Sequence, residues 1–145
     1  MAYLIILGVS VLILAFLFFR RKAASAIQFT PAARWLAWIG LFLLGVQAVF
    51  WFGMGIGEIS GGVSGGVMHL IPGAALLLTL FLAWKIPLES GLILAFQGLA
   101  LAVSTLVGTN ESFSGLMAVL VFTALPPMLI GLLLLWACGL SLKKN

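Results

Sequence analysis

The chain has little charge for its length. Its 145 residues include seven Lys or Arg and three Asp or Glu, which makes only 7% of the residues charged. A soluble globular domain is about 25% charged and about half apolar. Here 64% of the residues are hydrophobic and the mean hydropathy is +1.33. So few charges cannot give an apolar core a wettable surface, which excludes a soluble globular domain and indicates a protein embedded in lipid.

Cysteine and histidine are almost absent as well. The single cysteine, Cys138, lies in an apolar run and cannot form an intrachain disulfide. One cysteine and one histidine cannot provide the four ligands of a structural zinc site, so we expect no metal site and no cofactor. The seven cations lie between hydrophobic runs and form no basic stripe, so nucleic acid is not an expected partner.

Five hydrophobic runs approach the roughly 20 residues that a helix needs to cross a bilayer. They cover residues 3–19, 33–52, 67–84, 90–107 and 116–139. The sequence therefore predicts an all-α fold, a polytopic transmembrane bundle of about five helices. Residues 1–22 form an N-terminal anchor helix and residues 33–145 a four-helix unit. The positive charges follow the first run, whereas those of a signal peptide precede it, so we expect an uncleaved anchor.

The positive charges all fall on one side of this five-span arrangement. With the N-terminus outside and the C-terminus in the cytoplasm, the inner segments are residues 20–34, 85–89 and 140–145. They contain every cation of the chain, namely Arg20, Arg21, Lys22, Arg34, Lys85, Lys143 and Lys144. Short cytoplasmic segments are enriched in Lys and Arg. The charge pattern thus predicts a multi-pass protein of the cell inner (cytoplasmic) membrane.

Glycine is concentrated at one predicted connection. Residues 53–66 contain seven glycines, which lose much backbone entropy on ordering and disfavour a regular helix. We expect an outer loop or compact turn here. A phosphate-binding loop is the alternative, but the segment lacks the lysine and the strand-to-helix context of such loops.

Small residues and prolines mark two features inside the spans. Gly91, Ala95, Gly98 and Ala102 pair at spacings of four residues, which predicts a face for close helix packing. Pro126 and Pro127 lie near the middle of the last span, where missing backbone donors predict a kink. Helix starts are expected at Thr30-Pro31 and at Pro87. Gln47 and Gln97 lie inside the second and fourth spans, where their amides favour hydrogen bonds across helices, with a polar line to a small cavity as the alternative.

His69 is the candidate functional side chain. It lies near the outer end of the third span, on the same side as Glu58 and Glu111, so the three could form a polar cluster. An imidazole there could act as a proton-sensitive switch, a weak metal site or a haem ligand. The structural interpretation is a histidine at the headgroup level that bonds to a backbone carbonyl or to Glu58, and it is the one favoured.

Residues 33–144 carry short motifs that point to a family. The motifs are His69-Leu70-Ile71-Pro72 at a helix start, Ala83-Trp84-Lys85 at a helix end, and Leu125-Pro126 with Leu129-Ile130-Gly131 in the last span. In these the chain resembles a family of small prokaryotic membrane proteins known only as a domain of unknown function. The resemblance implies a four-helix unit and singles out His69, but it implies no activity.

Three functional hypotheses follow from these features. The first is a non-enzymatic accessory or assembly subunit of a larger membrane complex, with membrane lipids and other membrane protein subunits as partners. It would pack through the face of Gly91, Ala95, Gly98 and Ala102. The alternative is a small transporter or a lipid- or small-molecule-binding protein, in which the proline kink opens a cavity. The third and least favoured is a membrane enzyme that uses His69.

Overall fold

A computed structural model describes residues 5, 8–10, 12–13, 16–17, 29–63, 66–108 and 113–142. Within these ranges every regular element is a helix and no residue lies in a strand, which confirms the all-α prediction. The described residues of the first predicted span, from Ile5 to Leu17, are helical. Most of that span, together with the cations at 20–22, 143 and 144 and with Glu111, lies outside the described residues.

Helix α2 runs from Pro31 to Ser60 and is the longest element, with 30 residues. It begins where the sequence predicts. Thr30 is extended and its hydroxyl accepts a hydrogen bond from the Ala33 amide at 3.3 Å, while Pro31 occupies the first turn. Proline suits that position because its missing N–H would have no partner there.

Helices α3, Gly66–Lys85, and α4, Pro87–Gly108, are separated by a single buried residue, Ile86. Pro87 opens α4 as expected, and Glu89 lies in its first turn, where the helix dipole favours a carboxylate. Pro72 differs from its predicted place in a first turn. Because α3 already begins at Gly66, Pro72 lies inside the helix, where it is buried.

The last span is divided into three consecutive segments. Helix α5, Phe113–Val119, leads directly into a π-helical turn, η1, Leu120–Ala124, and then into α6, Leu125–Leu142. The Leu125 amide donates to the Leu120 carbonyl, five residues back. The wide turn comes immediately before Pro126 and Pro127, which have no amide hydrogen to donate to the preceding turn. A π-turn is one of the recognised ways in which a helix accommodates such a local irregularity.

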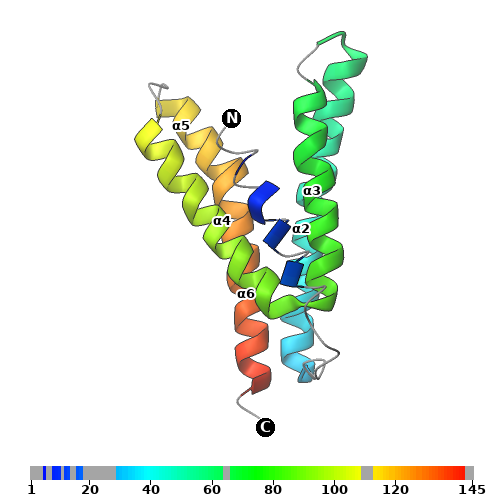
Figure 1. The fold of residues 1–145 in the computed structure, drawn as a ribbon, viewed down its shortest axis with the longest axis vertical. Helices are drawn as coiled ribbons and strands as arrows, with labels where there is room; N and C mark the ends of the chain where they lie inside the picture. The colour runs from blue at the N-terminus through cyan, green and yellow to red at the C-terminus, as the bar shows by residue number, and fades with distance from the viewer. Residues whose placement is uncertain are drawn as a thin grey trace.

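The helices form two antiparallel pairs. Helix α2 packs along α3, and α4 packs along the α5–η1–α6 span. Contacts between α2 and α6 join the pairs, whereas α3 and α4 meet over a much smaller area. Figure 1 shows the consequence, because the two pairs lie together at one end of the molecule and diverge towards the other.

The core lies where the two pairs converge. Small buried residues on one face of α2, including Ala33, Ala37 and Ala48, allow α6 and α3 to approach closely. Around them pack the larger buried side chains Leu44, Leu76, Leu94, Ile130 and Leu134. The Leu134 side chain lies so close to Gly40 that a Cβ there would meet it at 3.3 Å.

The glycine-rich segment corrects one prediction. An outer loop or compact turn was expected at residues 53–66, but α2 continues as a helix through Gly53, Gly55 and Gly57 to Ser60. The reason is the packing of α3. A Cβ on Gly55 would lie 2.7 Å from Leu70 Cδ2 and 2.9 Å from the Gly66 carbonyl oxygen. Gly55 and Gly66 thus allow two backbones to touch, and the contact compensates for their entropic cost.

A turn at residues 61–63 follows this long helix. Gly62 has a φ of 77°, a left-handed conformation that favours glycine. The Val63 amide donates to the Glu58 carbonyl at 2.8 Å, which closes the end of α2. Only this short turn, and not the whole predicted segment, breaks the helical path within the described part.

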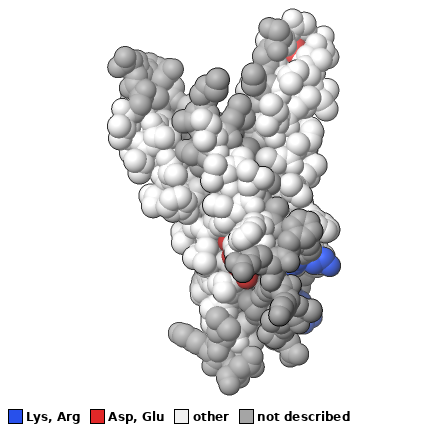
Figure 2. All heavy atoms as spheres, in the orientation of Figure 1, with Lys and Arg blue, Asp and Glu red and all other residues white. Residues whose placement is uncertain are grey.

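The described surface is overwhelmingly apolar. Figure 2 shows a mostly uncharged surface with the blue atoms of Lys and Arg gathered at one end. Large side chains such as Trp35, Phe42 and Phe96 are about 70% exposed. Three helical stretches of the described chain, Pro31–Ser60, Pro87–Val107 and Phe113–Ser141, are long and apolar enough to cross a membrane. Exposed apolar area of this extent indicates a membrane protein, and the finer count of five spans stays a prediction.

Candidate functional site

His69 and Glu58 meet at the end of the molecule where the helix pairs are far apart. His69 lies in the first part of α3 and Glu58 in the last turns of α2, and their Nδ1 and Oε2 atoms are 2.7 Å apart. Their side chains are 30% and 31% exposed. With its proton on Nδ1, the imidazole donates to the carboxylate, and when doubly protonated it forms an ion pair with it. Two of the three residues in the predicted polar cluster are therefore in contact.

Trp51 is a third member of this cluster that sequence reasoning missed as a partner of His69. Its ring stacks on the imidazole, with centroids 5.6 Å apart and planes at 25°. The sequence spacing could have indicated this contact. Trp51 precedes Glu58 by seven residues, or two helical turns, and so lies on the same face of α2. We call Glu58, His69 and Trp51 the tip cluster. In it, Glu58 bonds to the edge of the imidazole and Trp51 stacks on its face.

The tip cluster supplies a carboxylate and an imidazole, two groups that form hydrogen bonds. Among the residues that the structure describes, no group of three or more His, Cys, Asp or Glu could hold a metal ion. Cys138, the only thiol, is buried on α6, far along the sequence from the tip cluster. Glu111 falls in residues 109–112, outside the described part, and its place in the predicted cluster is untested.

The predicted packing face of α4 lies against α6. A Cβ on Gly98 would come within 2.6 Å of the Ala124 carbonyl oxygen and the Met128 amide nitrogen. A Cβ on Gly91 would lie 3.1 Å from the Gly131 carbonyl oxygen, and Gly131 in turn faces Ala95. Ala102 is half-buried on the same helix. This face is thus used inside the chain, so contacts with another subunit would need a different surface.

A groove of about 450 Å³ lies between α2 and the span that contains η1 and α6, and we call it the Gln47 groove. It is lined by Leu43, Val46, Gln47, Phe50, Val121, Phe122, Leu125, Pro126, Leu129 and Ile130. Gln47 is its only polar lining residue. The groove lies beside the predicted kink, since Pro126 forms part of its wall. Sequence reasoning could not find it, because its two walls are more than 70 positions apart.

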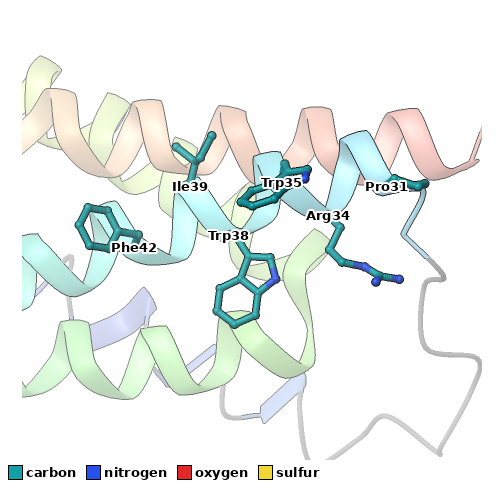
Figure 3. A pocket seen from close by; sticks show the side chains of 6 residues that line it. All are labelled: Pro31, Arg34, Trp35, Trp38, Ile39 and Phe42. Atoms are coloured by element: carbon teal, nitrogen blue, oxygen red, sulfur yellow. The ribbon is translucent and has the colours of Figure 1, made fainter.

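The opposite end of the molecule carries cations and tryptophans. Arg34 in the first turn of α2 and Lys85 at the end of α3 lie at the same end of this helix pair. Trp38 and Trp84 make an edge-to-face contact there, with centroids 4.9 Å apart. A shallow hollow is lined by Pro31, Arg34, Trp35, Trp38, Ile39 and Phe42, and Figure 3 shows the arginine extending towards the start of α2. Arginine beside tryptophan is typical of a membrane–water boundary.

Comparison with known families relates the chain to a domain of unknown function. The profile of the domain of unknown function DUF7670 matches residues 24–145, which is most of the chain. The chain belongs to this family. The match confirms the resemblance to a domain of unknown function and leaves the N-terminal residues 1–23 outside the family domain. No curated protein and no solved structure matches the chain.

Proposed function

We propose that this DUF7670 member is a non-enzymatic accessory or assembly subunit of a larger complex in the cytoplasmic membrane. It crosses the membrane five times, with the N-terminus outside and the C-terminus in the cytoplasm. What supports the orientation is the placing of cations: Arg34 and Lys85 lie at one end with the Trp38–Trp84 contact. The tip cluster lies at the other end of the same helix pair.

The observation that carries the proposed role is the tip cluster at the end of an unusually long helix. At 1.5 Å per residue, the 30 residues of α2 extend about 45 Å. The hydrocarbon core of a bilayer is about 30 Å thick, so the end that carries Glu58 reaches the headgroup level or beyond. There the cluster presents one carboxylate and one imidazole, each about 30% exposed, on a rigid support.

A partner is a better explanation of the tip cluster than stability. An exposed ion pair contributes only about 0–1 kcal/mol to folding. Recognition by another subunit, in contrast, benefits from polar groups whose positions are fixed before binding. Stacking by Trp51 and the direct backbone contact between Gly55 and Gly66 fix the position of His69 relative to Glu58.

Purification from the native membrane tests this role. The tagged chain, extracted in a mild detergent, is expected to retain other membrane proteins in fixed proportion. The double variant Glu58→Gln, His69→Ala should lose most of them while keeping its own elution profile. Ser60→Ala is the matched control, because Ser60 is exposed at the same tip and its hydroxyl donates to the Gly57 carbonyl of its own helix. Recovery of the wild-type chain alone, without any partner, would overturn the proposal.

Labelling of intact cells tests the orientation separately. A lysine-reactive reagent that cannot cross the membrane should leave Lys85 unmodified until the cells are opened. A cysteine introduced at Val63, which is exposed in the turn after α2, should react with an impermeant maleimide from outside. Modification of Lys85 from outside would reverse the orientation.

A second candidate function is supported by a specific observation. The Gln47 groove is apolar, faces the surrounding lipid and contains one buried amide, which suits a small transporter or a lipid- or small-molecule-binding protein. Its walls include Pro126, next to the π-turn, where a change of helix geometry could alter the width of the groove.

A further inference from the structure

The Gln47 groove has two walls. Leu43, Val46 and Phe50 form the α2 side, while Phe122 and Pro126 lie on the opposite side. The rings of Phe50 and Phe122 stack across the groove, with centroids 6.0 Å apart and planes at 14°. This contact bridges the two walls, so a molecule in the groove would lie beside the stacked rings and against Gln47.

Gln47 has an unsatisfied polar atom at this place. Its side chain is 7% exposed, and its Oε1 atom is buried with no hydrogen-bond partner among the described residues. The sequence predicted that this amide would bond across helices, and for Oε1 the structure shows no such bond. A buried polar atom without a partner is strongly disfavoured in hydrocarbon, where no water can replace it.

The depth of Gln47 restricts what can satisfy it. Gln47 follows Trp38 by nine residues, which places it about 14 Å further along α2. With the tryptophans at the boundary, this is close to the middle of a hydrocarbon core about 30 Å thick. Phospholipid headgroups stay at the membrane surface, and acyl chains carry no donor. A molecule that dissolves in the hydrocarbon itself reaches this depth and can carry the missing donor.

A hydroxyl group matches the amide better than other donors. Rotation about the terminal torsion of glutamine exchanges its oxygen and nitrogen, so either atom can face the groove. A hydroxyl donates to the oxygen or accepts from the nitrogen and suits both orientations. The other nine lining residues are apolar, so an ionised group would have no counter-charge in the groove.

We propose that the Gln47 groove binds a hydroxyl-bearing lipophile, an uncharged apolar molecule whose hydroxyl lies at mid-membrane depth and bonds to the Gln47 amide. This proposal rests on the second candidate function, that of a lipid- or small-molecule-binding protein or transporter, and names the class of molecule bound. It does not depend on the tip cluster. Binding satisfies the amide and covers the apolar walls, whereas the empty groove leaves Oε1 without a partner.

A matched pair of probes tests the hydroxyl. The probes are 7-tridecanol, whose hydroxyl is in the middle of a 13-carbon chain, and tridecane, which lacks it. The full chain in detergent micelles is titrated with each probe, and the shift of its thermal unfolding temperature is followed by tryptophan fluorescence. The alcohol should stabilise the wild-type protein at concentrations about five- to tenfold lower than the alkane, as expected for one net hydrogen bond. Equal potency of the two probes would overturn the proposal.

Two variants locate the effect in the groove. Gln47→Leu should remove the preference for the alcohol and should raise the unfolding temperature of the empty protein, because the unsatisfied amide is gone. Gln97→Leu, the control, removes another buried amide, which lies on α4 and does not line the groove, and should keep the preference. A Gln47→Leu protein that is less stable or does not fold would contradict the proposal, since the amide would then be bonded within the protein.

These results are separable from the accessory role. Gln47→Leu should retain the same co-purifying proteins as wild type, because the groove and the tip cluster share no residue. Loss of partners with an intact alcohol preference would count against the tip cluster only. If the wild-type protein retains its partners but shows no preference for the alcohol over the alkane, only the groove proposal is contradicted.

Discussion

The two helix pairs use glycine in different ways. In the α4–α6 pair, Gly91, Gly98 and Gly131 lie within the helices and bring two backbones together along the middle of the interface. In the α2–α3 pair, Gly55 and Gly66 do so only at the far end, beside the tip cluster. The comparison shows that glycine in a membrane helix is interpreted correctly only when its packing partner is known, because the same residue can indicate a loop or a tight helix contact.

The largest expected effect is in the middle of the α4–α6 pair. Gly98→Leu should destabilise the protein by about 3 kcal/mol or more, because even a Cβ would collide with the Ala124 and Met128 backbone. Thermal unfolding in micelles measures the loss. Gly139→Leu on α6 is the control, since a Cβ there meets nothing within 4 Å. Equal stability of the two variants would mean that α4 and α6 do not pack as described.

A smaller loss is expected at the end of the α2–α3 pair. Gly55→Ala should cost about 1–3 kcal/mol, because the added methyl group meets both the Leu70 side chain and the Gly66 carbonyl oxygen. Part of this clash can relax by a shift of the half-buried Leu70, which the backbone contacts of Gly98 do not allow. The same unfolding assay compares the stability losses of Gly55→Ala and Gly98→Leu. A larger loss at Gly55 than at Gly98 would reverse the comparison.

A gain of stability is expected at Gly57, on the same helix. Gly57→Ala should stabilise the protein by about 0.5–1 kcal/mol, since alanine favours a helix over glycine and a Cβ there meets nothing within 4 Å. The measurement decides between helix and loop at residues 53–60. No gain, or a loss, would favour the loop that the glycine content alone predicts.

The smallest effect is expected at the tip cluster. A double-mutant cycle with Glu58→Gln and His69→Asn should give a coupling of less than about 1 kcal/mol, because both side chains are about 30% exposed. Unfolding of the four proteins under identical conditions gives this value. A coupling of several kcal/mol would make the pair a structural element and would weaken its proposed role in recognition.

The elements that local sequence determines were predicted well. Thr30 and Pro31 start α2, Pro87 starts α4, and the small residues of α4 lie on a closely packed face. Each depends on neighbours within one or two helical turns. The Glu58–His69 contact was also anticipated, because two ends of adjacent antiparallel helices must lie near one another.

The features that depend on distant packing were not predicted. The close packing of the helix at Gly55 depends on α3, which approaches from outside the segment. The stacking of Trp51 on His69 depends on the rotation of α3 about its axis, which no local pattern specifies. The Gln47 groove lies between α2 and the span that contains the π-turn and Pro126, two segments that only the tertiary fold brings together.

The connection between α3 and α4 has a consequence for the accessibility of the backbone. Ile86 is its only residue, and hydrogen bonds continue across it: the Ile86 amide donates to the Leu82 carbonyl and the Ser90 amide to the Ile86 carbonyl. A protease needs an extended, exposed stretch of chain, which this reversal does not provide. Limited digestion from that side of the membrane should therefore leave the two helices joined as one fragment.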